Sequence, residues 1–256
     1  RFAIEDPCHR PLAQVYSRSG AEVVPVPMDE SGIRVAELEA SGAQIVHVSP
    51  SHQYPTGTVM PITRRQELLA WMGRGEERFL IEDDYDSEFR FDAHPVPAMQ
   101  ALDGRGRVIY MNTFTKTLAP SIRISYMVLP GELMRVFQKR LGFYSCTVPS
   151  FEQYTLARFL DRGYFEKHIN RMRNHYRALR DKLLAELRQS PLAGKVRISE
   201  ENAGLHFLLE LDTQRSDEDI RAAAEREDLR LAINEWLTGC GLFDAVLDLG
   251  APIAAE

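Results

Sequence analysis

Lys116 is the residue of this sequence whose surroundings point most directly to chemistry. It follows the apolar run Val108–Met111 and stands among hydroxyl groups and a sharp turn in the segment Thr113–Arg123. Most lysines are solvated surface residues. A lysine held at the end of a strand, however, can lose its proton and attack an aldehyde to form a Schiff base. We therefore expect Lys116 to act as a nucleophile toward a carbonyl group.

Three side chains close to Lys116 in the sequence have the chemistry of a phosphate site. Thr113 and Thr115 offer small hydroxyl donors, and Arg123 offers a guanidinium that can bind phosphate through two hydrogen bonds. Pyridoxal 5'-phosphate (PLP) carries both an aldehyde and a phosphate. This segment therefore predicts a PLP site.

A PLP site also needs an acid against the pyridine nitrogen, because a carboxylate there keeps the ring protonated and electron-withdrawing. Asp83 directly follows the apolar run Phe79–Glu82, and the nearby Tyr85 has a phenol that can donate to the ring oxygen of the cofactor. Two other interpretations stay open: an exposed acidic turn, or a hard-cation site formed by Asp83, Asp84 and Asp86. The cluster lacks the glycine turn and the distal glutamate of a calcium loop, so we predict no metal site.

The residues above belong to a chain in which strand-like runs alternate with helical or loop segments. The chain opens on a strand-like run that ends at Pro7. The later runs are Ala21–Val26, Gln44–Val48, Phe79–Glu82, Val108–Met111 and Ser125–Leu129. A helix is expected to start near Thr63, because Thr63–Gln66 has the spacing of a capping box. This alternation predicts an α/β fold with a mainly parallel sheet, in which ligands collect at the carboxyl ends of the strands.

The second half of the chain is predominantly helical in pattern. Residues Phe151–Leu187 read as helix with a break near Gly163. An apolar stripe at spacings of three and four is formed by Ile169, Met172, Tyr176, Leu179, Leu183 and Leu187. Further on we expect a turn and strand in Ser199–Leu211, a helix at Ser216–Asp228 and a strand at Leu229–Ala232.

Two domains follow from this change in character, with a boundary near Pro149. We predict that residues 1–149 form part of a large PLP-binding domain. Residues 150–256 are expected to form an interdomain helix and a small C-terminal α+β domain.

Composition narrows the class of protein. The 256 residues carry a formal net charge of −6 and are 44% hydrophobic, which is ordinary for a globular protein and excludes wholesale disorder. The apolar runs are too short for a membrane span, and the mild acidity argues against a nucleic-acid groove made by these residues alone. The three cysteines are scattered, with neither the spacing of a metal site nor that of a disulfide framework. The sequence also shows no secretory leader pattern. We expect a cytoplasmic protein, and, since no initiator methionine precedes the first strand-like run, a piece of a longer chain.

Five segments carry a resemblance to a known family. They are Ser49–Pro61, Glu82–Phe89, Thr113–Arg123, Pro149–Gln153 and Ala203–Phe207. In this order they resemble the PLP-dependent aminotransferases of fold type I, and specifically the aminotransferase-like domain of MocR-type transcriptional regulators of the GntR superfamily. The resemblance spans nearly the whole chain. It implies an α/β large domain with a mainly parallel sheet, here without its N-terminal part, and a smaller α+β C-terminal domain.

The same resemblance assigns roles to the reactive residues. It implies that Lys116 is the Schiff-base lysine, Asp83 the partner of the pyridine nitrogen and Tyr85 the residue bonded to the ring oxygen. The phosphate cluster is matched by Thr113, Thr115 and Arg123.

Further positions match the family less closely. His9 stands where the family usually has an aromatic residue stacked on the pyridine face. The segment Pro55–Gly57 resembles the loop beside the ring, where simpler aminotransferases have Asn-Pro-Thr-Gly. His52 and Gln53 precede it here, and we include Gln53 among the expected cofactor-binding residues.

The carboxylate-binding arginine of the family is not obvious in this sequence. Arg230 is our candidate for that substrate-binding role. The spacing from Lys116, however, places the expected position nearer Glu235, which is an acid.

The resemblance implies a regulator's effector domain, in which PLP on Lys116 forms an aldimine with an amino compound. DNA would then be bound only by a winged helix in the absent N-terminal part, which also includes a helix N-terminus that cradles the cofactor phosphate. A homodimer with the cofactor at its interface is implied too. Two alternatives stay open. One is a free-standing class I/II aminotransferase that transfers an amino group between an amino acid and a 2-oxo acid, with Lys116 as the base; the other is a PLP-free interaction domain.

Overall fold

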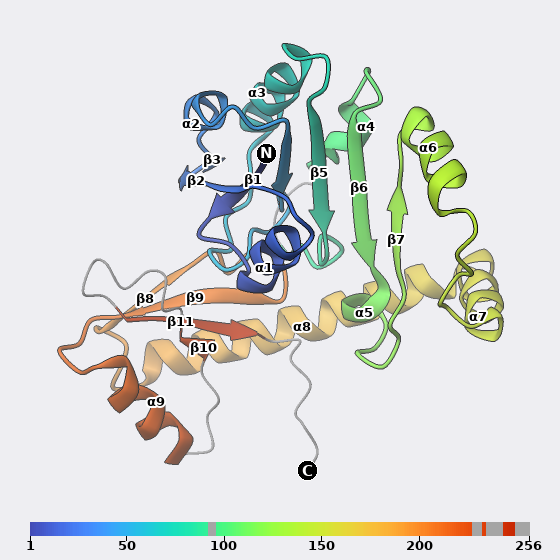
Figure 1. Ribbon diagram of the computed structural model, residues 1–256. Coiled ribbons are helices and arrows are strands. Elements are labelled where there is room, and N and C mark those ends of the chain that lie inside the picture. Colours follow the sequence, from blue (N-terminus) through green and yellow to red (C-terminus); the bar gives the residue numbers. More distant parts are fainter. Residues whose placement is uncertain (92–95, 227–231, 234–242, 249–256) are drawn as a thin grey trace.

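Two β-sheets organise the chain in the computed structural model, which describes residues 1–91, 96–226, 232–233 and 243–248 (Figure 1). The large sheet has seven strands in the order β3-β2-β1-β4-β5-β6-β7. These strands are β1 (Phe2–Asp6), β2 (Val23–Asp29), β3 (Gly32–Ile33), β4 (Ile45–Val48), β5 (Phe79–Asp84), β6 (Val108–Thr113) and β7 (Ser125–Val128). Among the described residues, no helix combines the length and the apolar character that crossing a bilayer requires.

The centre of the large sheet is parallel. Strands β2, β1, β4, β5 and β6 pair in parallel, while β3 and β7 pair antiparallel at the two ends of the sheet. Each strand-like run expected in this half of the chain overlaps one of these strands, so the predicted α/β fold with a mainly parallel sheet is confirmed. The carboxyl ends of β1, β4, β5 and β6 therefore lie at one edge of the sheet.

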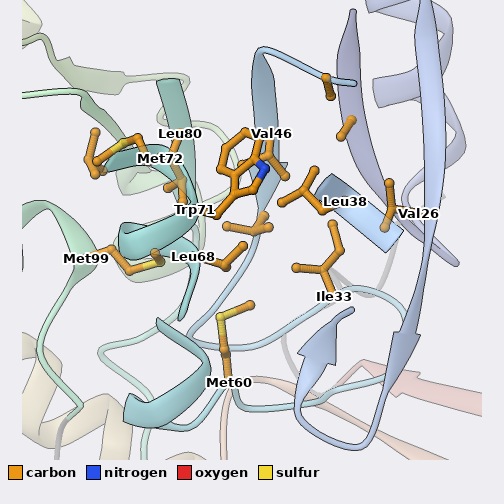
Figure 2. Packing of buried hydrophobic residues seen from close by; sticks show 14 residues of the cluster. Val26, Ile33, Leu38, Val46, Met60, Leu68, Trp71, Met72, Leu80 and Met99 are labelled. Carbon is orange, nitrogen blue, oxygen red and sulfur yellow. The ribbon is translucent and has the colours of Figure 1, made fainter. Parts of the chain in front are cut away.

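Helices flank the large sheet, and the second, third and fourth of them supply residues to its buried core. The helices are α1 (Arg10–Arg18), α2 (Val35–Ala40), α3 (Ile62–Gly73), α4 (Met99–Leu102), α5 (Phe114–Thr117) and α6 (Gly131–Leu141). Figure 2 shows Trp71 of α3 and Leu38 of α2 packed against Val46 of β4, and all three are fully buried. Burying a large apolar side chain is worth about 1.5–3 kcal/mol, so this layer is a main source of stability.

The predicted capping box at Thr63 is wrong. Helix α3 begins at Ile62, and its N-cap is Pro61, at φ −68°, with no side-chain cap. The fixed φ of proline suits this helix start, and Thr63 lies inside the first turn. Arg65 of the same helix is fully buried and donates to the carbonyl oxygens of Pro50, Met60 and Pro97. The helix thereby fixes the loop between β4 and α3, which leads into the site.

The predicted break near Gly163 is confirmed. It separates α7 (Ser150–Asp161) from the long α8 (Tyr164–Gln189), and Gly163 has a φ of +65°. The predicted apolar stripe is wrong at Leu179, which is 40% exposed, whereas the neighbouring Arg180 is buried. Arg180 is drawn inward because its guanidinium donates to the carbonyl oxygen of Glu201 and to the side chain of Asn202.

The second sheet is antiparallel, with the order β10-β11-β9-β8. Its elements are β8 (Val196–Ser199), β9 (His206–Leu211), α9 (Asp217–Arg226), β10 (Ala232–Ile233) and β11 (Phe243–Asp248). Helix α8 runs from α7 below the large sheet to this small sheet (Figure 1). Most of the strand expected at Leu229–Ala232 lies outside the described residues, and the division of the chain at Pro149 stays a prediction.

The two sheets meet through a loop on each side. The loop after β5 pairs with the loop before β9, where Phe91 N donates to Asn202 O at 3.1 Å and Gly204 N donates to Phe89 O at 2.8 Å. Phe89, Phe91 and Leu205 also form a second buried apolar cluster with α8. The start of β9 is thus docked directly beside the carboxyl end of β5.

The face formed by β7, α6 and α7 is apolar and exposed. Its large exposed side chains include Tyr126, Met127, Val128, Val136, Phe137, Phe143, Tyr144, Phe151 and Tyr154, with exposed fractions from 41% to 81%. A cavity of about 600 Å³ also opens between β7 and α7, and its lining is mainly apolar. Apolar surface of this extent is typical of a face that contacts further polypeptide.

Candidate active site

A cavity of about 460 Å³ lies at the carboxyl ends of β1, β4, β5 and β6. It brings together seven of the residues that the sequence pointed to, namely His9, Asp83, Tyr85, Thr113, Thr115, Lys116 and Arg123. The parallel strands explain this, because each residue follows or ends a strand at the same edge of the sheet.

One end of the cavity is built by the turn after β6. Thr113 is the N-cap of α5, and its hydroxyl accepts from the backbone N–H of Thr115 at 3.2 Å. The two threonine hydroxyl oxygens are 3.0 Å apart, and Arg123 donates to that of Thr115 at 3.4 Å. Lys116 follows on α5 and is half-buried. Two hydroxyls and a guanidinium are therefore adjacent, as an anion site requires.

Asp83 is supported by a histidine and a tyrosine that sequence reasoning missed. His47 of β4 is buried, and its Nε2 lies 3.4 Å from Asp83 Oδ2. The hydroxyl of Tyr16 lies 2.7 Å from the other ring nitrogen, Nδ1, of His47. Burial and the charge of Asp83 raise the pKa of Tyr16 to about 12, so its phenol stays protonated. In the tautomer in which this phenol donates to Nδ1, the imidazole proton lies on Nε2 and faces Asp83.

Tyr85 presents a protonated phenol to the cavity. Burial, followed by the charges of Asp86 and Asp83, raises the pKa of Tyr85 well above its ordinary value. Its hydroxyl donates to the backbone oxygen of His52 at 2.7 Å. Tyr85 is therefore a hydrogen-bond donor whose position depends on the β4–α3 loop.

Glu5, at the end of β1, is a second residue that the sequence did not single out. It lines the cavity with 5% of its surface exposed, and its carboxylate accepts from Ser49 N at 3.2 Å. Burial raises the pKa of Glu5 to about 8, although the hydrogen bonds from Ser49 and Gln53 oppose this shift. The cavity thus holds a carboxyl group that is neutral at pH 7 next to Asp83.

Two predicted cofactor-binding residues occupy different surroundings. Gln53 is buried outside the cavity lining, where it donates to Pro7 O at 2.8 Å and accepts from Thr56 N at 3.0 Å. It fixes the loop, and its direct contact with a cofactor stays a prediction. His9 is exposed and lines the cavity, with its ring edge-on to Tyr54 at 5.4 Å.

The three aspartates of the acidic cluster face different partners. Asp83 faces His47, as described. Asp84 accepts from the hydroxyls of Tyr110 at 2.7 Å and Ser87 at 2.8 Å. Asp86 lies 2.8 Å from Nδ1 of His52. The three carboxylates are therefore used separately rather than gathered around one cation.

The candidate substrate residue Arg230 and the competing Glu235 lie outside the described residues.

The donor set fits PLP group by group. The cavity contains an amine for the aldehyde, a carboxylate for the ring nitrogen, a phenol for the ring oxygen, and two hydroxyls with a guanidinium for the phosphate. Of the residues that the sequence missed, Glu5 and His47 also line the cavity, and Tyr16 contacts His47 from outside the lining. A signal for them existed in principle, because Glu5 and His47 end or nearly end strands whose carboxyl ends were expected at the site.

Comparison with known proteins agrees with the geometry. The family description "Aminotransferase class I and II" matches residues 1–235. The uncharacterized HTH-type transcriptional regulator YhdI of Bacillus subtilis is 43% identical over 226 residues, covering 88% of this chain and 48% of that protein. The probable rhizopine catabolism regulatory protein MocR of Rhizobium meliloti is 37% identical over 230 residues, covering 90% and 46%. The chain spans about half the length of these relatives.

A solved structure shows the same fold. Kynurenine aminotransferase of Pyrococcus horikoshii, in complex with PMP, superposes with a TM-score of 0.80 at 26% identity, covering 98% of this chain and 64% of that one. The resemblance to MocR-type regulators and the expected aminotransferase fold are both confirmed. The chain belongs to the aminotransferase class I and II family.

Proposed function

We propose that this chain is the PLP-binding, aminotransferase-like effector domain of a MocR-type transcriptional regulator, and that its ligand is an amino compound. One observation carries the proposal: a single cavity unites Lys116 and Asp83 with the hydroxyls and guanidinium of the β6–α5 turn. The names of the relatives YhdI and MocR support the regulator reading over that of a free enzyme.

Each residue of the cavity has a task in this proposal. Lys116 supplies the amine that holds the cofactor and moves a proton. Asp83, oriented by His47, would hold a proton at the ring nitrogen. Tyr85, whose proton goes to the backbone oxygen of His52 in this structure, would turn it to the ring oxygen. When bound, PLP supplies an aldehyde and an electron-withdrawing ring. The phosphate is assigned to Thr113, Thr115 and Arg123.

A second candidate is a free-standing aminotransferase. The observation that favours it is the match over 98% of the chain to kynurenine aminotransferase, whose structure contains PMP together with substrates and products. The two candidates share the fold and the cavity. They differ in whether the amino group leaves the ligand.

We further propose a cytoplasmic homodimer, with the exposed apolar face of β7, α6 and α7 covered by other polypeptide. DNA contact is assigned to a part of the protein outside this chain. The support is the extent of exposed apolar surface and the size of the regulators that the chain resembles.

The test is a PLP titration of the full-length protein, followed by visible absorption. Wild type and the control Lys139→Ala, which alters an exposed lysine of α6, should develop an absorption band, whereas Lys116→Ala should not. A mixture of amino compounds is then added. A band that shifts and persists identifies a sensor, and conversion of the cofactor to its pyridoxamine form identifies an aminotransferase. Absence of any Lys116-dependent band would overturn both candidates.

A further inference from the structure

A buried polar cluster joins the loops of the cavity to the small sheet. His52 and Asp86 come from the loops after β4 and β5, and His206 is the first residue of β9. Their exposed fractions are 1%, 1% and 5%. The cluster therefore lies inside the contact between the two sheets, and Asp86 and His206 also belong to the lining of the cavity.

Asp86 is the centre of this cluster. Its Oδ2 lies 2.8 Å from His52 Nδ1 and accepts from the backbone N–H of Leu205 at 3.1 Å. Burial favours the neutral acid, yet the neighbouring His52 and the hydrogen bonds hold the pKa of Asp86 below its ordinary value. A single charged carboxylate thus binds one loop of the large sheet and one loop of the small sheet.

The contact has no free space at Gly204. This residue has a φ of +69°, and a Cβ at this position would lie 1.8 Å from His52 Nδ1 and 2.6 Å from Asp86 Oδ2. The backbone before β9 therefore rests directly on both side chains. Packed groups without free volume transmit displacements to their neighbours.

His52 continues this contact to the cavity. Its backbone oxygen accepts from the hydroxyl of Tyr85, and its Nδ1 lies 3.5 Å from the same hydroxyl. Tyr85 directly precedes Asp86 in the chain. The contacts thus run from the loop before β9, through Asp86 and His52, to the phenol that lines the cavity.

A metal centre is the competing interpretation of the same residues. One ligand atom of each of His52, Asp86 and His206 lies within 4.8 Å of the others. The two imidazole rings, however, stack with centroids 3.9 Å apart and planes inclined by 37°. Stacked rings do not direct their in-plane lone pairs at one point, as a tetrahedral ion requires. The arrangement is that of a packed polar contact.

We propose that Asp86 and His52 are positioning residues that couple the docking of loop 203–206 to the orientation of the Tyr85 phenol. This rests on the proposed function for the contact of Tyr85 with PLP. A ligand that moves the start of β9 would thereby change the hydrogen bond that Tyr85 offers in the cavity.

The first test uses the full-length protein without cofactor. Two quantities are measured in Asp86→Ala and Asp84→Asn: the NMR signals of the tyrosine side chains and hydrogen exchange at the Leu205 amide. The Tyr85 signal is assigned by comparison with Tyr85→Phe. Asp84 is a matched control, because it is a buried carboxylate of the same segment that bonds to Tyr110 and Ser87. We expect Asp86→Ala to move the Tyr85 signal and to raise exchange at Leu205 by about tenfold or more, with neither change in the control. An unmoved Tyr85 signal would overturn the proposal.

The second test is a double-mutant cycle on the dissociation constant of PLP. Asp86→Ala and Tyr85→Phe should each weaken binding about tenfold, and the double variant also about tenfold instead of about a hundredfold. Asp86→Asn, which keeps the shape and an acceptor for Leu205, should restore binding to within about twofold. Additive effects, or an Asn variant as weak as the Ala variant, would overturn the positioning role.

Two outcomes are separated by this design. If wild type forms no Lys116-dependent band, the proposed function fails, while the cofactor-free measurements still decide the coupling.

Asp86→Ala removes a buried charge and can unfold the protein, so His52→Phe serves as a second variant. It keeps a ring of similar size and removes the Nδ1 contact to Asp86, and we expect the same change at Tyr85.

Discussion

Two histidine–aspartate pairs stand at the ends of the same two strands, yet their surroundings differ. In the first, His47 lies 3.4 Å from Asp83, and the Asp83 side chain is 36% exposed toward the cavity. In the second, His52 lies 2.8 Å from Asp86, and both side chains are at most 2% exposed. The first, open pair is accessible from the cavity, whereas the second, enclosed pair is almost fully buried, although Asp86 also belongs to the cavity lining.

The difference shows that burial and third partners decide what such a pair does. Asp83 keeps accessible surface in the cavity, so its charge is available to a bound molecule. Asp86 directs Oδ2 to His52 and Leu205, whereas its buried Oδ1 has no hydrogen-bond partner among the described residues. Burial and the adjacent His52 also lower the pKa of His206 to about 3, which leaves that ring neutral at the contact.

The largest expected effect concerns stability at the enclosed pair. Asp86→Ala should lower the free energy of unfolding by about 3–5 kcal/mol, because it removes one partner of a buried pair. Asp83→Ala should cost about 1 kcal/mol or less, since its pair is partly solvated. Urea denaturation of both variants measures this contrast. Equal losses would mean that the two pairs are energetically alike.

The next effect concerns ligand affinity at the open pair. Asp83→Asn should weaken PLP binding about thirtyfold, because a charge-assisted hydrogen bond is replaced by a neutral one. Asp84→Asn, one residue further along β5, is the control and should change affinity little. Fluorescence titration with PLP gives both constants. A similar loss in the control would remove the special role of Asp83.

The third prediction concerns Glu5, which makes the free energy of unfolding depend on pH. Its pKa is about 8 in the folded protein against an ordinary value of 4.5, so the folded state holds a proton that the unfolded state has released. Its contribution to stability is complete below pH 4.5 and is lost as pH rises through 8, by about 1.4 kcal/mol per pH unit in between. Between pH 5.5 and 7 this amounts to about 2 kcal/mol.

The measurement is urea unfolding of wild type and Glu5→Gln at both pH values. The variant keeps a neutral group of the same shape and should lose less stability than wild type over this interval. Parallel pH profiles would show that Glu5 ionises normally.

The smallest effect concerns the third partner of the open pair. Tyr16→Phe removes the hydroxyl that is hydrogen-bonded to His47 Nδ1 and should weaken PLP binding about three- to fivefold, as expected for one neutral hydrogen bond. Tyr110→Phe, which breaks a phenol–carboxylate bond outside the cavity, is the control. An unchanged affinity in Tyr16→Phe would limit the role of Tyr16 to packing.

Much of the fold was predictable because local pattern and global structure agree. Apolar runs bounded by polar clusters became the parallel strands. Lys116, Asp83 and Tyr85 met because each lies at or just after the carboxyl end of a strand of one sheet. The errors arose where tertiary contacts overrode local pattern. Arg180 displaces Leu179 from the buried face because its hydrogen-bond partners lie on another segment.

The contacts that the supporting residues make could not be predicted from the sequence pattern. Tyr16 and His47 are 31 positions apart, and nothing in their spacing brings a helix residue against a strand residue. Asp86 and Leu205 are 119 positions apart and meet only because two sheets dock. Such pairings depend on strand order and on the packing between sheets, which residue types alone do not specify.

Strand β7 has a consequence for how this polypeptide behaves in solution. Within the described residues it ends the large sheet, pairs only with β6 and exposes all four of its side chains. Its outer edge therefore offers a row of free backbone N–H and C=O groups beside aromatic side chains, a ready template for intermolecular β-pairing. Produced in isolation, the 256-residue chain should form larger particles as its concentration rises, and a proline or lysine placed in β7 should keep it dispersed.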